Sequence, residues 1–284
     1  MSTADAVTVV VPVWDRYCAF LPECVDALQN QVDGPPSIVV VDNASRVRLP
    51  ALPPSVAVVR SDARLSVGAA RNLGLGHVTT EQVIFCDADD RLLPDAIAFL
   101  RARLARRPGL VGVVCRYVSW NPETGAQAVL DGSPRRSAVR VARFRRLFAL
   151  VNLRYNCFPI VGGAFRAAAV RDAGGFGDAN VGEDWILGTQ LAFRGPLELH
   201  GRPTFVRRVH RGSLWYRKHD PAVYLARCDL LRARIRRDPR VPRWVKSLVP
   251  LLRYVHRRDV ARATAGHGAV DPINPLLEPR GAAE

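Results

Sequence analysis

The sequence has little that would anchor the chain in a membrane, export it or cross-link it. Its longest apolar runs, Val7–Val13 and Pro36–Val41, are far too short to span a bilayer. Met1–Asp5 lacks the basic segment that opens a secretory signal. The six cysteines are scattered without a Cys-x-x-Cys pair, so neither a zinc site nor a disulfide framework is indicated. We therefore expect a cytoplasmic protein with reduced core cysteines.

The sequence also lacks the common nucleotide-binding fingerprints and is poor in lysine and aromatic residues. It contains no Gly-x-Gly-x-x-Gly and no Gly-x-x-x-x-Gly-Lys-Ser/Thr motif. Only Lys218 and Lys246 are lysines, so the net charge of +15 comes mainly from arginine. Such a charge raises the hypothesis of a basic nucleic-acid-binding protein without catalysis. Nucleic-acid-binding proteins usually interleave aromatic and basic residues, and aromatics make up only 7% here, so we expect no nucleic-acid partner.

The composition and hydrophobic pattern indicate a globular α/β protein. Apolar residues make up 48% of 284 residues, enough for one large domain and a smaller appendage. Up to Val118 the pattern alternates between strands and helices, which predicts a mostly parallel sheet flanked by helices. The expected strands are Val7–Val13, Ser37–Val41, Val56–Val59, Gln82–Cys86 and Leu110–Val118, and the expected helices are Tyr17–Gln31, one starting near Ser66, and Pro94–Arg106.

Beyond Trp120 the alternation is less regular. We expect a polar excursion over Asn121–Pro134 and separate strands near Leu197–His200 and Thr204–His210. The other expected elements are a basic helix Ala138–Leu150, a strand Phe158–Phe165, helices Ala167–Asp172 and Glu183–Phe193, and two basic helices between Pro221 and Ala263.

Acidic side chains follow the strand Gln82–Cys86 at the point where it ends. Asp87, Asp89 and Asp90 lie within four positions, and carboxylate oxygens suit Mg²⁺ or Mn²⁺ carrying a diphosphate. Ligands bind at this carboxyl edge of α/β sheets. The alternative is a solvated turn that caps the next helix, and this segment alone does not decide between them. Asp42 ends another strand at the same edge, where it could bind a ribose or form an Asx turn.

Other residues also have two interpretations. Glu183 and Asp184 begin a helix, where they could cap it or supply a general base. Arg71 lies near a helix start, where it could hold phosphate or be a surface arginine. His210 lies beside several arginines, which does not suit an ordinary core histidine, so it is a candidate metal ligand.

Taken in order, six short motifs resemble those of a family 2 glycosyltransferase with the GT-A (Rossmann-like) fold. Each is weak alone, but together they span roughly residues 7 to 210 in the expected order. They are Val10-Val11-Pro12-Val13-Trp14-Asp15, Val41-Asp42-Asn43-Ala44-Ser45, Gly68-Ala69-Ala70-Arg71-Asn72, Asp87-Ala88-Asp89-Asp90, Gly174-Gly175-Phe176 and Gly182-Glu183-Asp184-Trp185.

The resemblance implies a role for each matching residue. Asp89 would bind the metal, Mn²⁺ or Mg²⁺, with Asp87 nearer the ribose and His210 as a further ligand. Asp184 would be the catalytic base, and Glu183 beside it would orient the acceptor. The implied nucleotide-binding residues are Pro12, Val13, Asp15, Asp42, Arg71 and Asp87. Asp15 departs from the family pattern, because relatives often carry Asn there.

The implied function is metal-dependent transfer of a sugar, with inversion, from a nucleotide-sugar to an acceptor hydroxyl. We favour a UDP-sugar, and the acceptor could be a saccharide, a lipid-linked sugar or a small natural product. A sugar-1-phosphate nucleotidyltransferase is the alternative enzyme. Such enzymes usually carry a Gly-rich loop after the first strand, whereas Pro12–Arg16 contains no glycine.

We expect a catalytic domain over residues 1–212, with a nucleotide-binding half 1–118 and an acceptor-side half 119–212. A basic helical region 213–265 and a loosely ordered tail 266–284 would follow. The basic helices leave two hypotheses open. They could simply pack on the catalytic domain, or they could make peripheral contact with anionic lipid at the inner face of the membrane.

Overall fold

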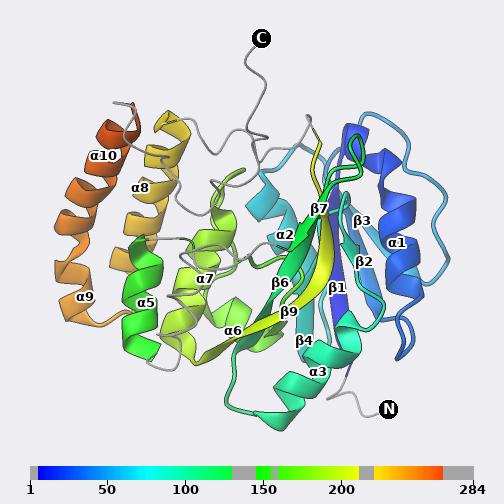
Figure 1. Cartoon of the computed structure of the whole chain (residues 1–284), viewed down its shortest axis with the longest axis horizontal. Coiled ribbons are helices and arrows are strands. Elements are labelled where there is room, and N and C mark those ends of the chain that lie inside the picture. Colours follow the sequence, from blue (N-terminus) through cyan, green and yellow to red (C-terminus); the bar gives the residue numbers. More distant parts are fainter. Residues whose placement is uncertain (1–5, 130–144, 155, 157–158, 211–220, 265–284) are drawn as a thin grey trace.

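The computed structural model describes residues 6–129, 145–154, 156, 159–210 and 221–264. In this part of the chain, strands and helices alternate through the first hundred residues (Figure 1). The strands are β1 (Val7–Val13), β2 (Ser37–Asp42), β3 (Val56–Arg60), β4 (Gln82–Phe85), β5 (Arg91–Leu92), β6 (Gly112–Trp120), β7 (Gln127–Val129), β8 (Ala164–Arg166) and β9 (Leu197–Arg208). The α-helices are α1 (Leu21–Gln29), α2 (Val67–Gly76), α3 (Ala96–Arg106), α5 (Arg145–Arg154), α6 (Ala167–Asp172), α7 (Glu183–Arg194), α8 (Pro221–Arg237), α9 (Arg243–Ser247) and α10 (Val249–Thr264), and a 3-10 helix spans Asp15–Ala19.

The strands form one mixed sheet in the order β3-β2-β1-β4-β8-β6-β9-β5, with β7 paired to β6. β1 lies in parallel between β2 and β4, with Val13 opposite Asp42 and Val10 opposite Phe85. The carboxyl ends of these three strands therefore meet at one edge of the sheet. β9 runs parallel to β6, and its last residues pair antiparallel with β5, so the end of β9 reaches the acidic loop after β4.

Helices cover both faces of the sheet. Successive side chains of a strand point to opposite faces, so each face presents apolar side chains to the helices that pack on it. Val9, Val11 and Val13 of β1 pack in one core cluster with apolar residues of α1 and α3. Val10 points to the other face and joins a second cluster that includes side chains from α2, α5, α6 and α7. This two-faced packing is the expected α/β architecture of helices flanking a sheet.

The C-terminal helices form a further layer against the second of these helical faces (Figure 1). Trp185 and Ile186 of α7 share a third core cluster with Tyr224 and Leu231 of α8 and with Val249 of α10. No helix in the described ranges has the length and apolar character needed to cross a membrane.

Several elements differ from the sequence prediction. The stretch after Trp120, expected to be a polar excursion, contains a short strand. The chain turns back after β6, and Gln127–Val129 pairs antiparallel with the end of that strand. The strand expected from Phe158 begins only at Ala164, since Gly162 turns the chain with a φ of +71°. The two strands expected near Leu197 and Thr204 are one, β9, interrupted by a register shift opposite Arg116.

Other predicted elements agree more closely. α2 begins directly after Ser66, whose hydroxyl accepts a hydrogen bond from the amide of Ala69 at 3.1 Å. The basic helix expected from Ala138 is α5, described from Arg145, and the residues before it and the tail 266–284 lie outside the described residues. Five of the six cysteines are described, and all five are buried, as expected of core cysteines: Cys18, Cys24, Cys86, Cys115 and Cys228.

The start of α2 packs closely against the segment that leads into α7. The amide of Gly68 donates to the carbonyl of Ala179 at 3.1 Å. A Cβ on Gly68 would lie 1.8 Å from the carbonyl oxygen of Gly177 and 3.1 Å from Cβ of Glu183. Only a glycine therefore permits this approach between the two halves of the sequence.

Gly68→Ala is expected to destabilise the fold by about 1–3 kcal/mol or more, because the backbone atom that it meets cannot rotate away. Gly76→Ala at the other end of α2 is the matched control, since a Cβ there meets nothing within 4 Å. That variant is expected to gain about 0.4–1 kcal/mol through reduced entropy of the unfolded chain. Chemical denaturation of both variants measures the difference, and equal stabilities would contradict the close packing.

Candidate functional site

The candidate site lies at the carboxyl edge formed by β1, β2 and β4. Asp42 is the last residue of β2, and Asp15 follows β1 by two positions. Asp87, Asp89 and Asp90 follow β4. The parallel pairing of the three strands brings these acidic residues, predicted from separate motifs, to the same edge of the sheet.

Two of the predicted nucleotide-binding residues are tied into the turn structure at this edge. Asp42 is buried, accepts from the amide of Ser45 at 3.0 Å and forms an ion pair with Arg60. The contact with Ser45 is the local turn that was the alternative interpretation of Asp42. Asp15 accepts from the amide of Arg46 at 2.9 Å and has a φ of +41°, an uncommon value for a residue other than glycine.

Pro12 and Val13 are interior residues next to this edge of the sheet. Both lie within β1 and are buried, and Val13 is fully enclosed in the core cluster beneath α1. Their side chains are therefore packed inside the protein and are not available to a ligand. They shape this edge of the sheet through the course of the backbone.

Arg71 connects the acidic loop to the start of α7. Its side chain is only 3% exposed. One terminal nitrogen donates to Oε1 of Glu183 at 2.6 Å, and the other forms an ion pair with Asp87. Burial lowers the pKa of Arg71, but the two carboxylates raise it more, so the guanidinium stays charged. Arg71 is thus a buried residue that bridges two carboxylates, and not a surface arginine.

Glu183 is buried at the first position of α7, next to Asp184. Burial and the neighbouring charge of Asp184 raise the pKa of Glu183 to about 7, against the opposing effect of Arg71. The structure therefore holds the Glu183 carboxyl inside the protein, bound to Arg71, whereas Asp184 beside it is partly exposed.

Asp184 is partly exposed, in contrast to the buried carboxyl of Glu183. Its Oδ1 accepts from the amide of Trp185 at 2.7 Å, and its Oδ2 accepts from the side-chain amide of Asn156 at 3.1 Å. Trp185 is fully buried and donates its indole N–H to the carbonyl of Asn152. The base candidate is therefore held in a fixed orientation at the start of a well-packed helix.

Asp89 and His210 come together from positions 121 residues apart in the sequence. Nε2 of His210 lies 3.0 Å from Oδ2 of Asp89, and the two side chains are 15% and 12% exposed. In the described part of the chain, no group of three or more His, Cys, Asp or Glu side chains is arranged to hold a metal ion. A two-residue set fits a divalent cation that is bound together with the oxygens of a diphosphate.

Sequence reasoning missed the role of Arg208, which orders the acidic loop. Its amide donates to Oδ1 of Asp90 at 3.1 Å, and its Nε donates to the carbonyl of Asp89 at 3.2 Å. The guanidinium lies 4.8 Å from the ring centroids of both Phe20 and Trp120 and forms an ion pair with Glu23 of α1. These partners lie on the acidic loop, in or next to α1 and at the end of β6, so no local pattern within β9 identifies them.

Asp90 is the buried member of the acidic loop. Burial, followed by the charges of Asp89 and Asp87, raises its pKa well above the ordinary value. Of the three carboxylates, Asp87 and Asp89 are therefore the two that face the site. Asp90 belongs to the packing beneath them.

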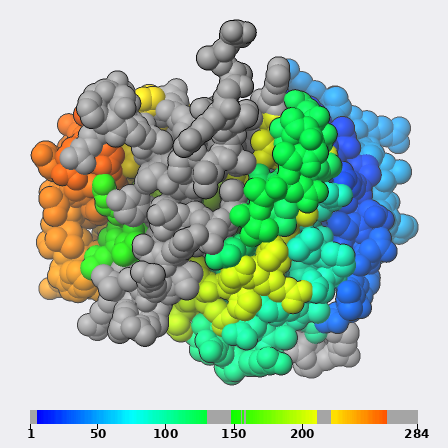
Figure 2. Space-filling model, viewed as in Figure 1, coloured from blue at the N-terminus to red at the C-terminus, as the bar shows by residue number. Residues whose placement is uncertain are grey.

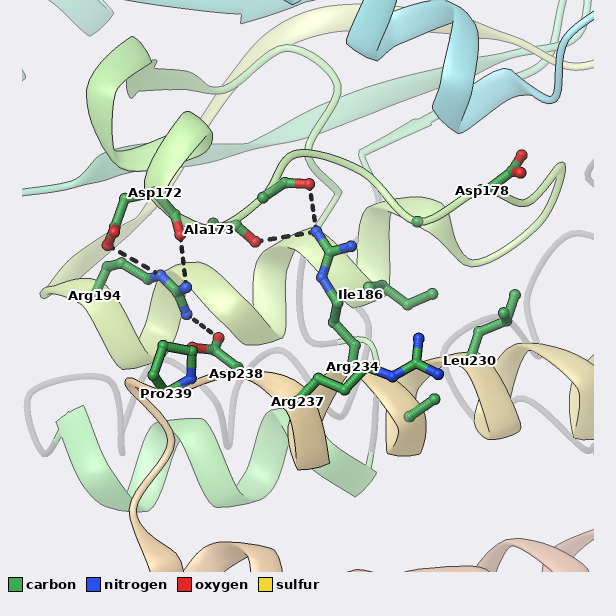
Figure 3. Close-up of a pocket in the computed structure, with 13 residues that line it drawn as sticks. Asp172, Ala173, Asp178, Ile186, Arg194, Leu230, Arg234, Arg237, Asp238 and Pro239 are labelled. Carbon is green, nitrogen blue, oxygen red and sulfur yellow. Dashed lines mark hydrogen bonds and ion pairs between the residues drawn. The ribbon is translucent and has the colours of Figure 1, made fainter.

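A separate hollow lies among α6, α7 and α8 (Figure 3). None of its lining residues is a predicted site residue. Arg194 is held there by Asp172 and Asp238, and Arg234 donates to the carbonyl groups of Ala173 and Gly174 (Figure 3). These contacts fix α8 against the loop after α6, so we assign the hollow to helix packing.

Comparison with solved structures identifies the fold. The chain aligns with S. aureus TarS 1–349 in complex with UDP-GlcNAc at a TM-score of 0.63 and 14% identity, covering 92% of this chain and 90% of that one. It aligns with the mannosyltransferase PcManGT from Pyrobaculum calidifontis, in complex with GDP-Man and Mn²⁺, at a TM-score of 0.56 and 22% identity, covering 92% and 75%. The fold is therefore of the GT-A class found in glycosyltransferases.

The sequence then places the chain within that class. The sequence model of the family "Glycosyl transferase family 2" matches residues 8–167, and the chain belongs to this family. The match includes the Arg71 and Asp87–Asp90 motifs and ends before Glu183, Asp184 and His210. Because the chain belongs to a glycosyltransferase family, the alternative of a sugar-1-phosphate nucleotidyltransferase is not supported.

One curated relative matches a shorter stretch. A TPR repeat-containing protein of Synechococcus elongatus is 31% identical over 98 residues. These residues amount to 34% of this chain, and the chain spans about a quarter of the length of that relative, 24%.

The raised pKa of Glu183 predicts a pH dependence of stability. The folded protein holds the Glu183 proton up to about pH 7, whereas an ordinary glutamate releases it near 4.5, so ionisation disfavours the folded state. As pH rises through this window, the wild type is expected to lose up to about 3 kcal/mol of stability relative to Glu183→Gln. Urea unfolding at several pH values measures this difference. A wild-type-to-variant difference that stays constant with pH would contradict the assignment.

Proposed function

We propose that the chain transfers a sugar from a nucleotide-sugar to an acceptor hydroxyl, with a divalent metal ion and with inversion at the anomeric carbon. The observation that carries the proposal is the ion-pair bridge from Asp87 through Arg71 to Glu183. It links the loop after β4, which carries the metal candidates, to the start of α7, where the base candidate Asp184 follows Glu183. Family membership supports the reaction class.

Asp89 and His210 would hold the metal, with Asp87 nearer the ribose. The partial exposure of the three side chains and the 3.0 Å contact between Asp89 and His210 support this assignment. When bound, Mn²⁺ or Mg²⁺ would supply positive charge to the leaving diphosphate. Asp15 and Asp42 lie at the ends of the neighbouring strands β1 and β2 and would contact the nucleoside.

Arg71 has a positioning role in this proposal rather than a contact with phosphate. Its buried guanidinium already binds two carboxylates, so it is not available to neutralise the diphosphate. It instead holds Asp87 at the donor side and Glu183 at the base side. Glu183 in turn directly precedes Asp184 in the first turn of α7.

Asp184 would act as the general base. As the acceptor oxygen attacks the anomeric carbon, its proton passes to Asp184 and the bond to the diphosphate oxygen breaks on the opposite face. Asn156 and the amide of Trp185 orient the carboxylate for this transfer. A single base and a single displacement give inversion of the anomeric configuration.

A UDP-sugar is the favoured donor, and the structural neighbours support a nucleotide-sugar in general. TarS is described in complexes with UDP and UDP-GlcNAc, and PcManGT is described in a complex with GDP-Man. The acceptor would be a hydroxyl of a saccharide, a lipid-linked sugar or a small natural product.

Asp184→Asn is expected to lower turnover by about 10²–10⁴-fold, because the amide cannot accept the proton. Donor binding should remain near the wild-type value, since the substitution keeps the shape and the contact with Trp185. Single-turnover transfer from a nucleotide-sugar, measured beside donor binding, separates the two effects. Normal transfer by the variant would remove Asp184 from the role of base.

Asp89→Ala is expected to abolish metal-dependent nucleotide binding. A nucleotide at about 100 times its Kd should stabilise the wild type by roughly 2.7 kcal/mol and raise its Tm by a few degrees. A panel of UDP, GDP, dTDP and CDP, each with and without Mn²⁺, measures this shift. Asp33→Ala, at an exposed position on the loop after α1, is the control that should retain it. An equal shift in the Asp89 variant would contradict the metal assignment.

A further inference from the structure

The outward side of α9 and α10 carries apolar and basic side chains together. Trp244, Leu251 and Tyr254 are 48%, 58% and 64% exposed. Among the large hydrophobic residues that are exposed in the described ranges, Trp244 and Tyr254 are the aromatic ones. Figure 2 shows α9 and α10 (orange) at the surface, on the side of the molecule away from α1 and β1 (blue).

These side chains are not needed to hold the helices in place. Val245 and Val249 are buried in the core cluster shared with α7 and α8, and Leu252 packs against it. The fold thus already uses the inward side of α9 and α10. The exposed aromatic and aliphatic groups lie on a different side, where burial in this chain does not explain them.

The helical spacing gathers apolar and basic groups on one surface. On α10, Leu251, Tyr254 and Arg258 recur at i, i+3 and i+7, and Arg257 follows Tyr254 by three positions. We call the exposed residues Arg243, Trp244, Leu251, Tyr254, Arg257 and Arg258 the outer face of α9–α10.

The charge of this segment is strongly one-sided. Residues 243–264 contain one acidic residue, Asp259, which pairs with Arg154 of α5 at 16% exposure. The basic residues of the same segment are Arg243, Lys246, Arg253, Arg257, Arg258 and Arg262. An anionic surface complements this distribution.

We infer that the outer face of α9–α10 docks on an anionic lipid surface. Trp and Tyr side chains favour the boundary between headgroups and acyl chains, and adjacent arginines bind anionic headgroups. An exposed leucine between them gains from burial among acyl chains, whereas a nucleic acid offers no comparable apolar environment. This docking concerns a surface remote from the sheet edge and does not depend on the donor or the acceptor of the proposed reaction.

The test is co-sedimentation of the full chain with phosphatidylcholine vesicles, with and without phosphatidylserine. The wild type is expected to bind only the vesicles that contain phosphatidylserine, and added salt should weaken binding. Arg257→Gln with Arg258→Gln should lower the affinity by about fivefold for each arginine removed. Trp244→Ser with Leu251→Ser should also weaken binding, including at salt concentrations that screen the charges.

Matched controls separate this surface from the general positive charge of the chain. Arg106→Gln removes an exposed arginine from α3, and Val129→Ser removes an apolar side chain that is 50% exposed on β7. Both controls should bind the vesicles as the wild type does, and all variants should keep the wild-type Tm because the substituted side chains are exposed.

Three outcomes would overturn the inference. One is binding that ignores phosphatidylserine content. The second is an equal loss of binding in the control variants and the outer-face variants. The third is salt-dependent binding to mixed RNA without binding to vesicles, which would assign the surface to nucleic acid.

Discussion

The ion pairs of one buried guanidinium connect the two chemical halves of the candidate site. Arg71 reaches Asp87 on the loop after β4 and Glu183 at the start of α7, and these two residues come from distant parts of the sequence. Removing one partner of a buried pair typically costs about 3–5 kcal/mol, because the remaining charge is left uncompensated. Both carboxylates therefore depend on Arg71 for their positions. The same contact holds Glu183 in the interior and leaves Asp184 as the more exposed carboxylate of the two.

The rest of the site follows from how the sheet is assembled. Parallel pairing of β1 with β2 and β4 brings three strand ends to one edge, and β9 returns to that edge with Arg208 and His210. Arg208 then ties the acidic loop to α1 through Glu23. The loop that presents Asp89 is thus held by the strand that precedes it and by Arg208 at the end of β9, which is itself bound to α1. Such support holds a carboxylate in place before any ligand binds.

The sequence allowed the strand ends and the start of α2 to be predicted, because these depend on local patterns. Apolar runs that end in Asp42 and Asp87 mark the sheet edge, and Ser66 marks a helix start. Family membership then agreed with the motif order over residues 8–167. The ion-pair partners of Arg71 could not be predicted from the sequence, because Glu183 lies 112 residues further along the chain and no local pattern links the two. The hairpin at β7 was missed because this strand is only three residues long and fully exposed, so it carries no alternating apolar pattern.

A double-mutant cycle on Arg71 and Glu183 tests most directly whether their contact holds the site together. Arg71→Met, Glu183→Gln and the double variant would be compared at about pH 8, above the Glu183 pKa of about 7, by urea unfolding and by binding of a nucleotide with Mn²⁺. If the bridge acts as described, Arg71→Met is strongly destabilised, and adding Glu183→Gln restores part of the loss because one buried charge is removed. Strictly additive effects, with nucleotide binding unchanged in Arg71→Met, would contradict the central role of Arg71.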